Sequence, residues 1–178
     1  MKIRNKILIL ILTFGLFSCK YSNQEKETKK SAPEFIHSEI GFSLPDSLKI
    51  INDYGQIFTK SQKAELNKNI SDYVINTTKE IIIVTIDSIK PYKDIQKFAT
   101  DLGNDWGIGA PKWNNGLTIV LCKPCKKIGI ATGTGTELIL TDEICKEVIE
   151  NTIIPEFKKG KFYNGINKGV TELITKWK

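Results

Sequence analysis

The chain has 178 residues and a formal net charge of +6. This length allows one ordinary domain with appendages, and a composition of 40% hydrophobic and 26% charged residues is typical of a globular protein. These values exclude a wholly disordered chain, a collagen and a polytopic membrane protein. The residue types set a further limit, because Arg4 is the only arginine and His37 is the only histidine.

Residues 1–18 have the features of a secretory signal. Three basic side chains are followed by an apolar run at 7–17, which is too short to span a bilayer. The run ends in Leu-Phe-Ser-Cys, which resembles a bacterial lipobox, so we predict that Cys19 becomes the first mature residue and carries lipid (palmitate). The alternative is an ordinary signal peptide followed by an incidental cysteine. Removal of residues 1–18 leaves a charge of +3, which gives no reason to expect a nucleic-acid partner.

The segment after Cys19 is predicted to be a flexible tether over residues 19–43. Between residues 20 and 31 it contains one apolar side chain, Tyr21, so it cannot bury enough surface to offset its ordering entropy. The domain itself is predicted over residues 44–178. A lipid on Cys19 would hold this domain on the extracytoplasmic side of a bacterial cell envelope, with the membrane and envelope proteins as partners.

The first half of the domain shows two strands and two helices. Residues 48–51 form a possible short strand, followed by a turn signal at 52–55. A capping box at Thr59-x-x-Gln62 begins a helix, and the β-branched run at 80–87 predicts a strand buried on both faces. Apolar side chains at helical spacing predict a second helix over residues 91–106.

The second half of the domain begins with a predicted β-hairpin. Strands at 117–122 and 127–132 are separated by only four residues, so they should pair. A glycine-rich turn at 132–136 and a strand-like segment follow. Thr141 caps a third helix, which Pro155 should break or kink, and residues 161–178 form a last helix. This order predicts a three-layer α/β/α sandwich with a small mixed central sheet.

The missing residue types exclude several mechanisms. Because residues 45–178 contain no histidine, Ser-His-Asp and Cys-His catalysis and histidine-ligated zinc are excluded in their usual forms. Because the mature chain contains no arginine, a Cys-Arg phosphatase loop is excluded as well. Carboxylates and amides remain, and these are the ligands of hard cations such as Ca²⁺ and Mg²⁺.

Oxygen donors occur in several predicted loops. Asp53 lies in the turn before the first helix, Asn114 and Asn115 precede a strand, and Glu137 and Asp142 flank the strand-like segment. Loops at one end of an α/β sheet meet at a common crevice, so these side chains could complete a divalent-cation site. The alternative is that the first three form turns and that Asp142 is a helix-terminal anion.

The cysteines suggest a second kind of chemistry. Cys122-Lys-Pro-Cys125 lies between two strands rather than at the start of a helix, so outside the cytoplasm it is predicted to form a disulfide that closes the hairpin turn. Redox activity, a free thiol and a metal role remain alternatives. Cys145 is predicted to be a buried helix residue.

The order of short motifs is similar to that of the TPM domain family. These motifs are LPDSLKIINDYGQIFTKSQKAEL, DWGIG, NNGLTIVL, KIGIATGTGTELILTD and IIPEFKKGKFYNGINKGV, and together they cover roughly residues 44–178. The resemblance implies an α/β/α domain that is secreted or membrane-tethered. It also implies kinship with photosystem II repair factors of plant thylakoids and with bacterial proteins of mostly unknown role. Some members of the family are described as acid phosphatases, and some bind Ca²⁺ or Mg²⁺.

The resemblance also implies roles for particular residues. Asp53 matches an early aspartate of the family, Asn114 and Asn115 match an Asp/Asn pair before a glycine, and Glu137 and Asp142 match later acidic positions. We therefore expect a cation-binding module that assists envelope protein assembly, repair or quality control. Two alternatives are a metal-assisted phosphatase with Asp53 orienting water, and a thiol module that uses the CKPC turn, which departs from the family pattern.

Overall fold

The structure is a computed structural model that describes residues 49–178. The predictions of a signal, a lipid on Cys19, a tether and a domain start at residue 44 therefore lie outside the described residues. The elements in chain order are β1 (Ile51–Asp53), α2 (Lys60–Thr77), β2 (Glu80–Ile86), α3 (Ile95–Asp105), β3 (Gly116–Cys122), β4 (Lys127–Thr132), α4 (Thr134–Glu137), α5 (Asp142–Val148), η1 (Ile149–Ile153), α6 (Ile154–Lys158) and α7 (Phe162–Lys176).

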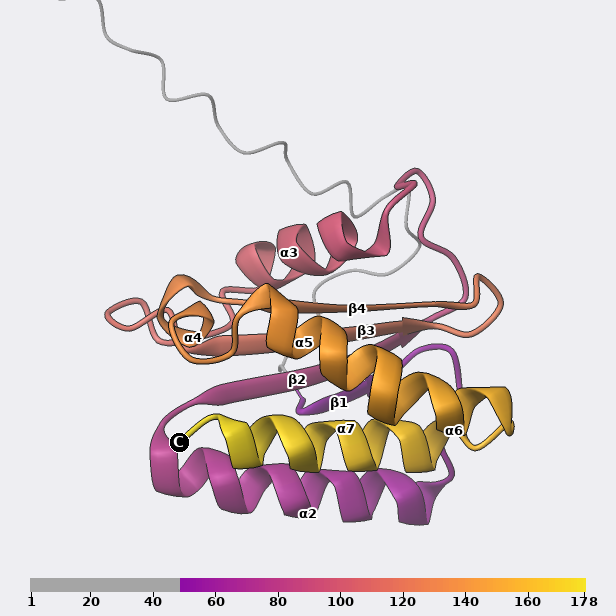
Figure 1. Ribbon diagram of the computed structural model, residues 1–178, viewed down its shortest axis with the longest axis horizontal. Helices are drawn as coiled ribbons and strands as arrows, with labels where there is room; N and C mark the ends of the chain where they lie inside the picture. Colours follow the sequence, from indigo (N-terminus) through magenta and orange to yellow (C-terminus); the bar gives the residue numbers. More distant parts are fainter. Residues whose placement is uncertain (1–48) are drawn as a thin grey trace, which may run out of the picture. The chain divides into compact units, whose positions relative to one another are not determined.

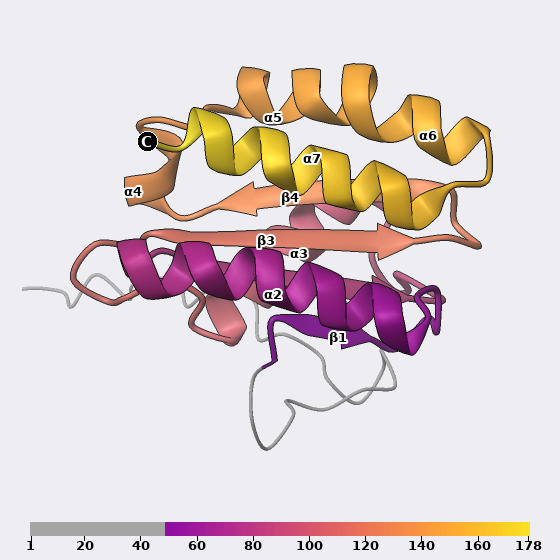
Figure 2. The ribbon, with the colours of Figure 1, turned by 90° about the horizontal axis from the view of Figure 1, so that it is seen from below.

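The four strands form one mixed sheet in the order β1-β2-β3-β4. The first three strands are parallel, and β4 returns antiparallel to β3 as the predicted hairpin. We call the end at which β1, β2 and β3 finish the carboxyl end of the sheet, and the end at which they start the amino end. Figure 2 shows α4 at the amino end and α6 near the carboxyl end.

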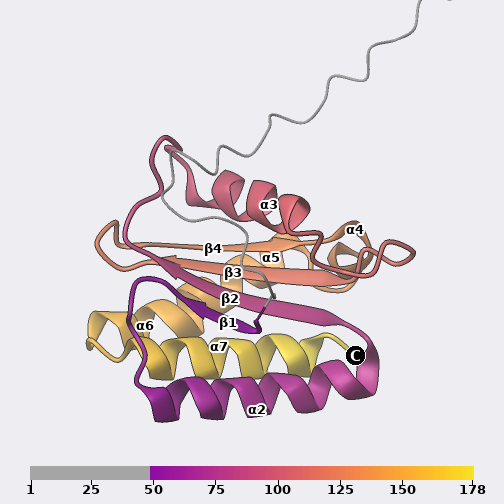
Figure 3. The same cartoon turned by 180° about the vertical axis from the view of Figure 1, so that it is seen from behind.

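Helices cover both faces of the sheet, so the predicted three-layer sandwich is confirmed. Alternate strand residues face opposite sides, with Ile81 and Ile83 in one buried cluster and Ile82 and Val84 in the other. The first cluster packs under α2, α5 and α7, and α3 covers the second (Figures 1 and 3). The β-branched run is buried along nearly its whole length because the sheet lies between these two layers.

The predicted capping box of the first helix is confirmed. The Thr59 hydroxyl accepts from the Gln62 N–H at 3.2 Å, and the Thr59 N–H donates to Gln62 Oε1 at 2.9 Å. The helix then buries Leu66 and Ile70 completely. Burial of two such side chains contributes roughly 1.5–3 kcal/mol each, so α2 is held mainly by packing.

The far ends of α2 and α7 are joined by three side chains. The Tyr73 hydroxyl and Lys79 Nζ both donate to the Trp177 carbonyl, at 2.6 Å and 2.7 Å. Lys79 Nζ also lies 5.0 Å from the centre of the Trp177 ring. Burial raises the pKa of Tyr73 to about 12, so its hydroxyl remains a donor at neutral pH.

Two predicted boundaries in the first half are shifted. The first strand is Ile51–Asp53 rather than 48–51, because Asp53 pairs with Thr85 in register and the turn begins after it. The second helix starts at Ile95 rather than at residue 91, because the Asp94 carboxylate accepts from the Gln96 N–H at 2.9 Å and fixes the helix start there.

The glycine-rich turn and the strand-like segment predicted in the second half are wrong. The short helix α4 begins inside TGTGT, directly after Gly133, and residues 138–140 form a turn instead of a strand. Pro155 was expected to break or kink the third helix, and it does not break it, because the helix continues to Lys158 through the π-helical turn η1. A π turn widens the backbone before the proline, and this accommodates a residue that has no N–H and would clash with the carbonyl four residues earlier.

Within residues 49–178, no helix combines the length and the apolar character that crossing a bilayer requires.

Candidate functional site

Asp53 lies at the carboxyl end of β1, and its carboxylate is fully used by the protein. Oδ1 accepts from the Ile57 N–H at 2.9 Å and from the Thr85 hydroxyl at 2.6 Å. Oδ2 accepts from the Phe58 N–H at 3.2 Å and lies 3.4 Å from Lys63 Nζ. These four partners attach the turn before α2 to strand β2, so the side chain acts as a structural anchor.

Burial and hydrogen bonding act on the pKa of Asp53 in opposite directions. Its side chain is 2% exposed, and burial alone would raise the pKa. The hydrogen bonds from Thr85, Ile57 and Phe58 and the interaction with Lys63 outweigh burial and hold the pKa below its ordinary 3.8. A depression of about 570 Å³ borders the residue, but a carboxylate with this little exposure presents almost no surface to it.

Asn115 belongs to the opposite, amino end of the sheet. Its Oδ1 accepts from the Ala110 N–H at 2.9 Å, and its Nδ2 donates to the Thr78 carbonyl at 3.0 Å. Both polar atoms of the side chain therefore hold the loop before β3 against the end of α2. Glu80 stabilises the same loop, because its carboxylate accepts from the Gly109 N–H at 2.8 Å.

Asn114 faces α4 at the same end. Its Nδ2 donates to the Thr134 hydroxyl at 3.2 Å, and its carbonyl accepts from the Gly135 N–H at 3.2 Å. A Cβ at Gly133 would lie 2.1 Å from the Asn114 carbonyl oxygen, so only glycine permits this close approach. Glu137 lies three residues after Thr134 in α4 and therefore on the same helix face, and it is exposed.

The five predicted ligands do not meet at one point, which corrects the expectation of a single site. Asp53 pairs with Thr85, whereas Asn115 accepts from the N–H of Glu80, five residues back along β2. Five residues of strand span about 17 Å, so Asp53 and Asn115 cannot share one ion. The expectation failed because the loop after β1 and the loop before β3 are at opposite ends of parallel strands.

The other two predicted ligands lie close together in the chain, because Glu137 ends α4 and Asp142 begins α5. Asp142 is its first residue and exposed, directly after the Thr141 cap. An anion in the first turn favours the helix through the macrodipole. Within residues 49–178, no group of three or more His, Cys, Asp or Glu side chains is close enough to hold a metal ion.

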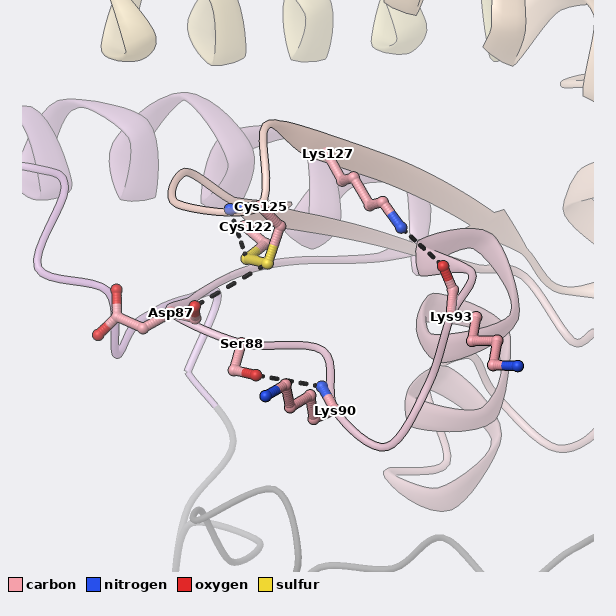
Figure 4. Close-up of a disulfide and its surroundings, with 7 residues drawn as sticks. All are labelled: Asp87, Ser88, Lys90, Lys93, Cys122, Cys125 and Lys127. Carbon is pink, nitrogen blue, oxygen red and sulfur yellow. Dashed lines mark hydrogen bonds between the residues drawn. A yellow bond between two sulfur atoms is a disulfide. The ribbon is translucent and has the colours of Figure 1, made fainter.

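Cys122 and Cys125 form a disulfide at the tip of the hairpin, with their Cα atoms 5.2 Å apart (Figure 4). The Cys125 N–H lies 3.3 Å from Cys122 Sγ, and Cys125 Sγ lies 3.9 Å from the Asp87 carbonyl oxygen. The second approach is a contact and not a hydrogen bond, because an oxidised sulfur has no proton to donate. The bond therefore closes the turn next to the end of β2.

Cys145 is the free cysteine of the described residues and is buried in α5. Burial, followed by the nearby negative charge of Asp142, raises the pKa of its thiol to about 11. The thiolate is therefore scarce at neutral pH, and the residue behaves as a small apolar side chain.

Sequence reasoning missed three polar residues that fix loops or an edge of the sheet. Thr85, the one hydroxyl within the apolar β2 run, was a visible signal, and it holds Asp53. Glu80 stabilises the loop before β3. Gln96 pairs its side-chain amide with both backbone groups of Ile130 in the edge strand β4, at 2.7 Å and 3.2 Å. No sequence pattern indicated that last contact.

The fold defines the class of protein as an α/β domain with a four-stranded mixed sheet between two helical layers. A TPM domain matches residues 51–176, which is well over half of the chain. The chain belongs to the TPM domain family. A comparison with curated proteins finds no match.

Three solved structures share the fold. The N-terminal domain of a P. gingivalis protein is 27% identical with a TM-score of 0.67, covering 74% of this chain and 83% of that one. The N-terminal domain of the cg2496 protein from Corynebacterium glutamicum is 16% identical with a TM-score of 0.59, covering 76% and 84%. The BA42 protein of the psychrophilic bacterium Bizionia argentinensis is 22% identical with a TM-score of 0.50, covering 65% and 84%.

Proposed function

We propose that this TPM domain is a lipid-anchored binding module of the bacterial cell envelope that assists protein assembly, repair or quality control. Cys19 would carry the lipid, and residues 20–43 would hold the domain away from the bilayer. The domain would bind a divalent cation, Ca²⁺ or Mg²⁺, at the amino end of the sheet.

The state of Asp53 supports binding rather than phosphatase chemistry. A carboxylate that orients an attacking water needs a free lone pair directed at that water. Both oxygens of Asp53 already accept two partners each, and the side chain is 2% exposed. One observation therefore carries the proposal: the carboxylate of Asp53, the most buried of the candidate acids, is already bound by four donors of the protein itself.

The oxygen atoms around α4 support a cation site smaller than the predicted one. Asn114 uses its Nδ2 on Thr134, so its Oδ1 is left as an acceptor, and the Glu137 carboxylate extends from the same helix face as Thr134. One carboxylate, one amide and one hydroxyl are oxygen donors of the kind that Ca²⁺ accepts. With one formal charge, such a site would bind weakly, on the order of 1 mM.

Calorimetric titration with Ca²⁺ tests the cation site. Glu137→Gln keeps the shape of the side chain and removes its charge, so we expect the heat of binding to disappear. Asp53→Asn serves as the matched control at the other end of the sheet and should leave the heat unchanged. Equal heats for wild type and Glu137→Gln would refute a site at α4.

The anchor is tested separately by replacing Cys19 with serine in the bacterial host. Labelled palmitate should enter the wild-type protein and not the variant, and the variant should move from the membrane to the soluble fraction. A variant that stays in the membrane fraction would show that Cys19 is not the anchor, whatever the result for the cation.

A further inference from the structure

A groove of about 440 Å³ lies between the hairpin tip and the start of α7, separate from the proposed cation site. Its floor is apolar and is formed by Ile128 of β4, Ile154 and Phe157 of α6, and Phe162 of α7. Leu121 and Cys122 complete the wall on the sheet side. A groove of this size suits a small ligand or one or two large side chains of a peptide.

Four lysines line the groove, at positions 123, 126, 127 and 158. Lys123 Nζ lies 5.0 Å from the centre of the Phe162 ring, and Lys127 Nζ donates to the Lys93 carbonyl at 2.6 Å (Figure 4). Among residues 49–178, no carboxylate forms an ion pair with any of the four. Glu156 lies on the same helix as Lys158, but it pairs with Lys159 and Lys168 instead. The groove is therefore apolar and positively charged, with no internal counter-charge.

The backbone of β4 adds a third feature. Ile130 directs its N–H and its carbonyl away from β3, where Gln96 binds both. Ile128 lies two residues away along the strand, so its N–H and carbonyl point in the same direction. Within residues 49–178, neither group has a hydrogen-bond partner. An open donor and acceptor therefore lie on the same residue that lines the apolar groove.

We propose that this groove binds a short extended peptide of a partner protein, in which an aliphatic or aromatic side chain is flanked by Asp or Glu. The apolar side chain would occupy the floor between Phe157 and Phe162. Its carboxylates would approach Lys123 and Lys158, and its backbone would pair with Ile128. The open backbone groups favour a peptide over a lipid tail, because a tail has neither a donor nor an acceptor for them.

The structure also limits the length of the paired segment. The Gln96 side chain already binds the N–H and the carbonyl of Ile130, so a peptide could pair with the backbone of β4 only at Ile128. The rest of the peptide would be bound by ionic and apolar contacts. The disulfide closes the turn that carries Lys123 and Lys126. Oxidation would therefore keep these lysines at the rim of the groove.

Fluorescence polarisation of the full chain with a labelled peptide in which Glu alternates with Leu and Phe tests this proposal. We expect saturable binding that weakens with added salt, and no binding of the analogue with Lys in place of Glu. Combined Lys123→Glu and Lys158→Glu should reduce the affinity at least about tenfold, because two attractions become repulsions. Both sites are exposed, so the variant should fold.

Three controls decide the outcome. Lys68→Glu with Lys112→Glu changes the net charge equally but lies outside the groove, so it should leave the affinity unchanged. A peptide N-methylated at its backbone should bind more weakly than the parent. The proposal is overturned if both double variants bind alike, if methylation has no effect, or if phosphatidylglycerol vesicles bind with the same dependence on Lys123 and Lys158. It is also overturned if the chain dimerises through these lysines.

Discussion

The two ends of the parallel sheet are built from similar polar residues but use them differently. At the carboxyl end, one buried carboxylate gathers four donors, Lys63 among them, and one disulfide closes the hairpin. Within the described residues, the four lysines that line the groove beside this disulfide have no carboxylate partner. At the amino end, Asn115 and Glu80 are used on backbone groups of one loop, while Glu137 and Asp142 remain exposed.

This difference shows that an acidic residue in a loop is not a ligand by virtue of its type alone. Asp53 is the most prominent candidate in the sequence, yet both of its carboxylate oxygens are already bound by groups of the protein itself. Glu137 is less prominent and keeps its carboxylate available. The contrast can be tested by removing one contact at each end and comparing the effects on stability and binding.

The largest effect is expected for Asp53→Ala at the carboxyl end. The substitution leaves the Thr85 hydroxyl, two N–H groups and Lys63 without their acceptor, so we expect a loss of roughly 3–5 kcal/mol in the free energy of unfolding. Urea denaturation followed by circular dichroism measures it. Asp87→Ala is the matched control, because Asp87 is an exposed aspartate after β2, and it should change stability by less than about 0.5 kcal/mol.

The pH dependence follows from the lowered pKa of Asp53. A carboxyl group whose pKa is lower in the folded state stabilises the protein fully above the unfolded value of 3.8, and this contribution is lost as the pH falls through the lower folded value. Wild-type stability should therefore decline below about pH 4 more steeply than that of Asp53→Asn. Parallel acid titrations of the two proteins would contradict the network described for Asp53.

A smaller effect is expected from the disulfide at the same end. The bond closes a very short loop, so the chain-entropy model gives about 2 kcal/mol for its removal. Combined Cys122→Ser and Cys125→Ser should lower the unfolding free energy by this amount, and reductant should bring the wild type to the same value. Mass spectrometry with and without an alkylating agent measures the thiol state. If reductant left the unfolding free energy of the wild type unchanged, the disulfide would not contribute to stability.

At the amino end, Asn115→Ala should cost about 1–3 kcal/mol. The side chain satisfies the Ala110 N–H and the Thr78 carbonyl at once, and both lose a partner in the variant. Thermal unfolding measures the change, with Asn164→Ala on the exposed face of α7 as the control. If the two variants melted alike, the loop before β3 would not depend on Asn115.

The smallest stability effect, about 1 kcal/mol, is expected for Gln96→Ala. The side chain binds both outward-facing backbone groups of Ile130 and so protects the edge strand β4. Its loss should also promote self-association through the exposed edge, which sedimentation velocity would detect as dimers at high protein concentration. Lys97→Gln on the same helix should remain monomeric under the same conditions.

Local sequence patterns predicted the elements well wherever the signal was carried by neighbouring residues. The Thr59 capping box, the buried run of β2 and the hairpin at 122–127 all depend on residues close together in the chain, and each is present. The patterns failed at α4, where the two glycines and three threonines of TGTGT suggested a turn, and at Pro155, where a π turn allowed the helix to continue unbroken.

The candidate site could be predicted only in part. The sequence showed which residue types could bind a cation, but it did not show which of them lie close together. The order of loops along the chain does not say at which end of a sheet each loop lies. Asp53 is the last residue of one strand and Asn115 precedes the first residue of another, and in a parallel arrangement this places them at opposite ends. Gln96 and the groove beside Ile128 were invisible for the same reason, since they join residues far apart in sequence.

By itself, the sequence determined the periodicity of the helices and strands, the absence of histidine and arginine chemistry from the domain, and the TPM domain family. These depend on composition and on spacing along the chain. Only the tertiary structure decided which carboxylates are already occupied and which lysines surround a groove. Hydrogen bonds, burial and charge act over a few ångströms in space, and a linear sequence does not contain those distances.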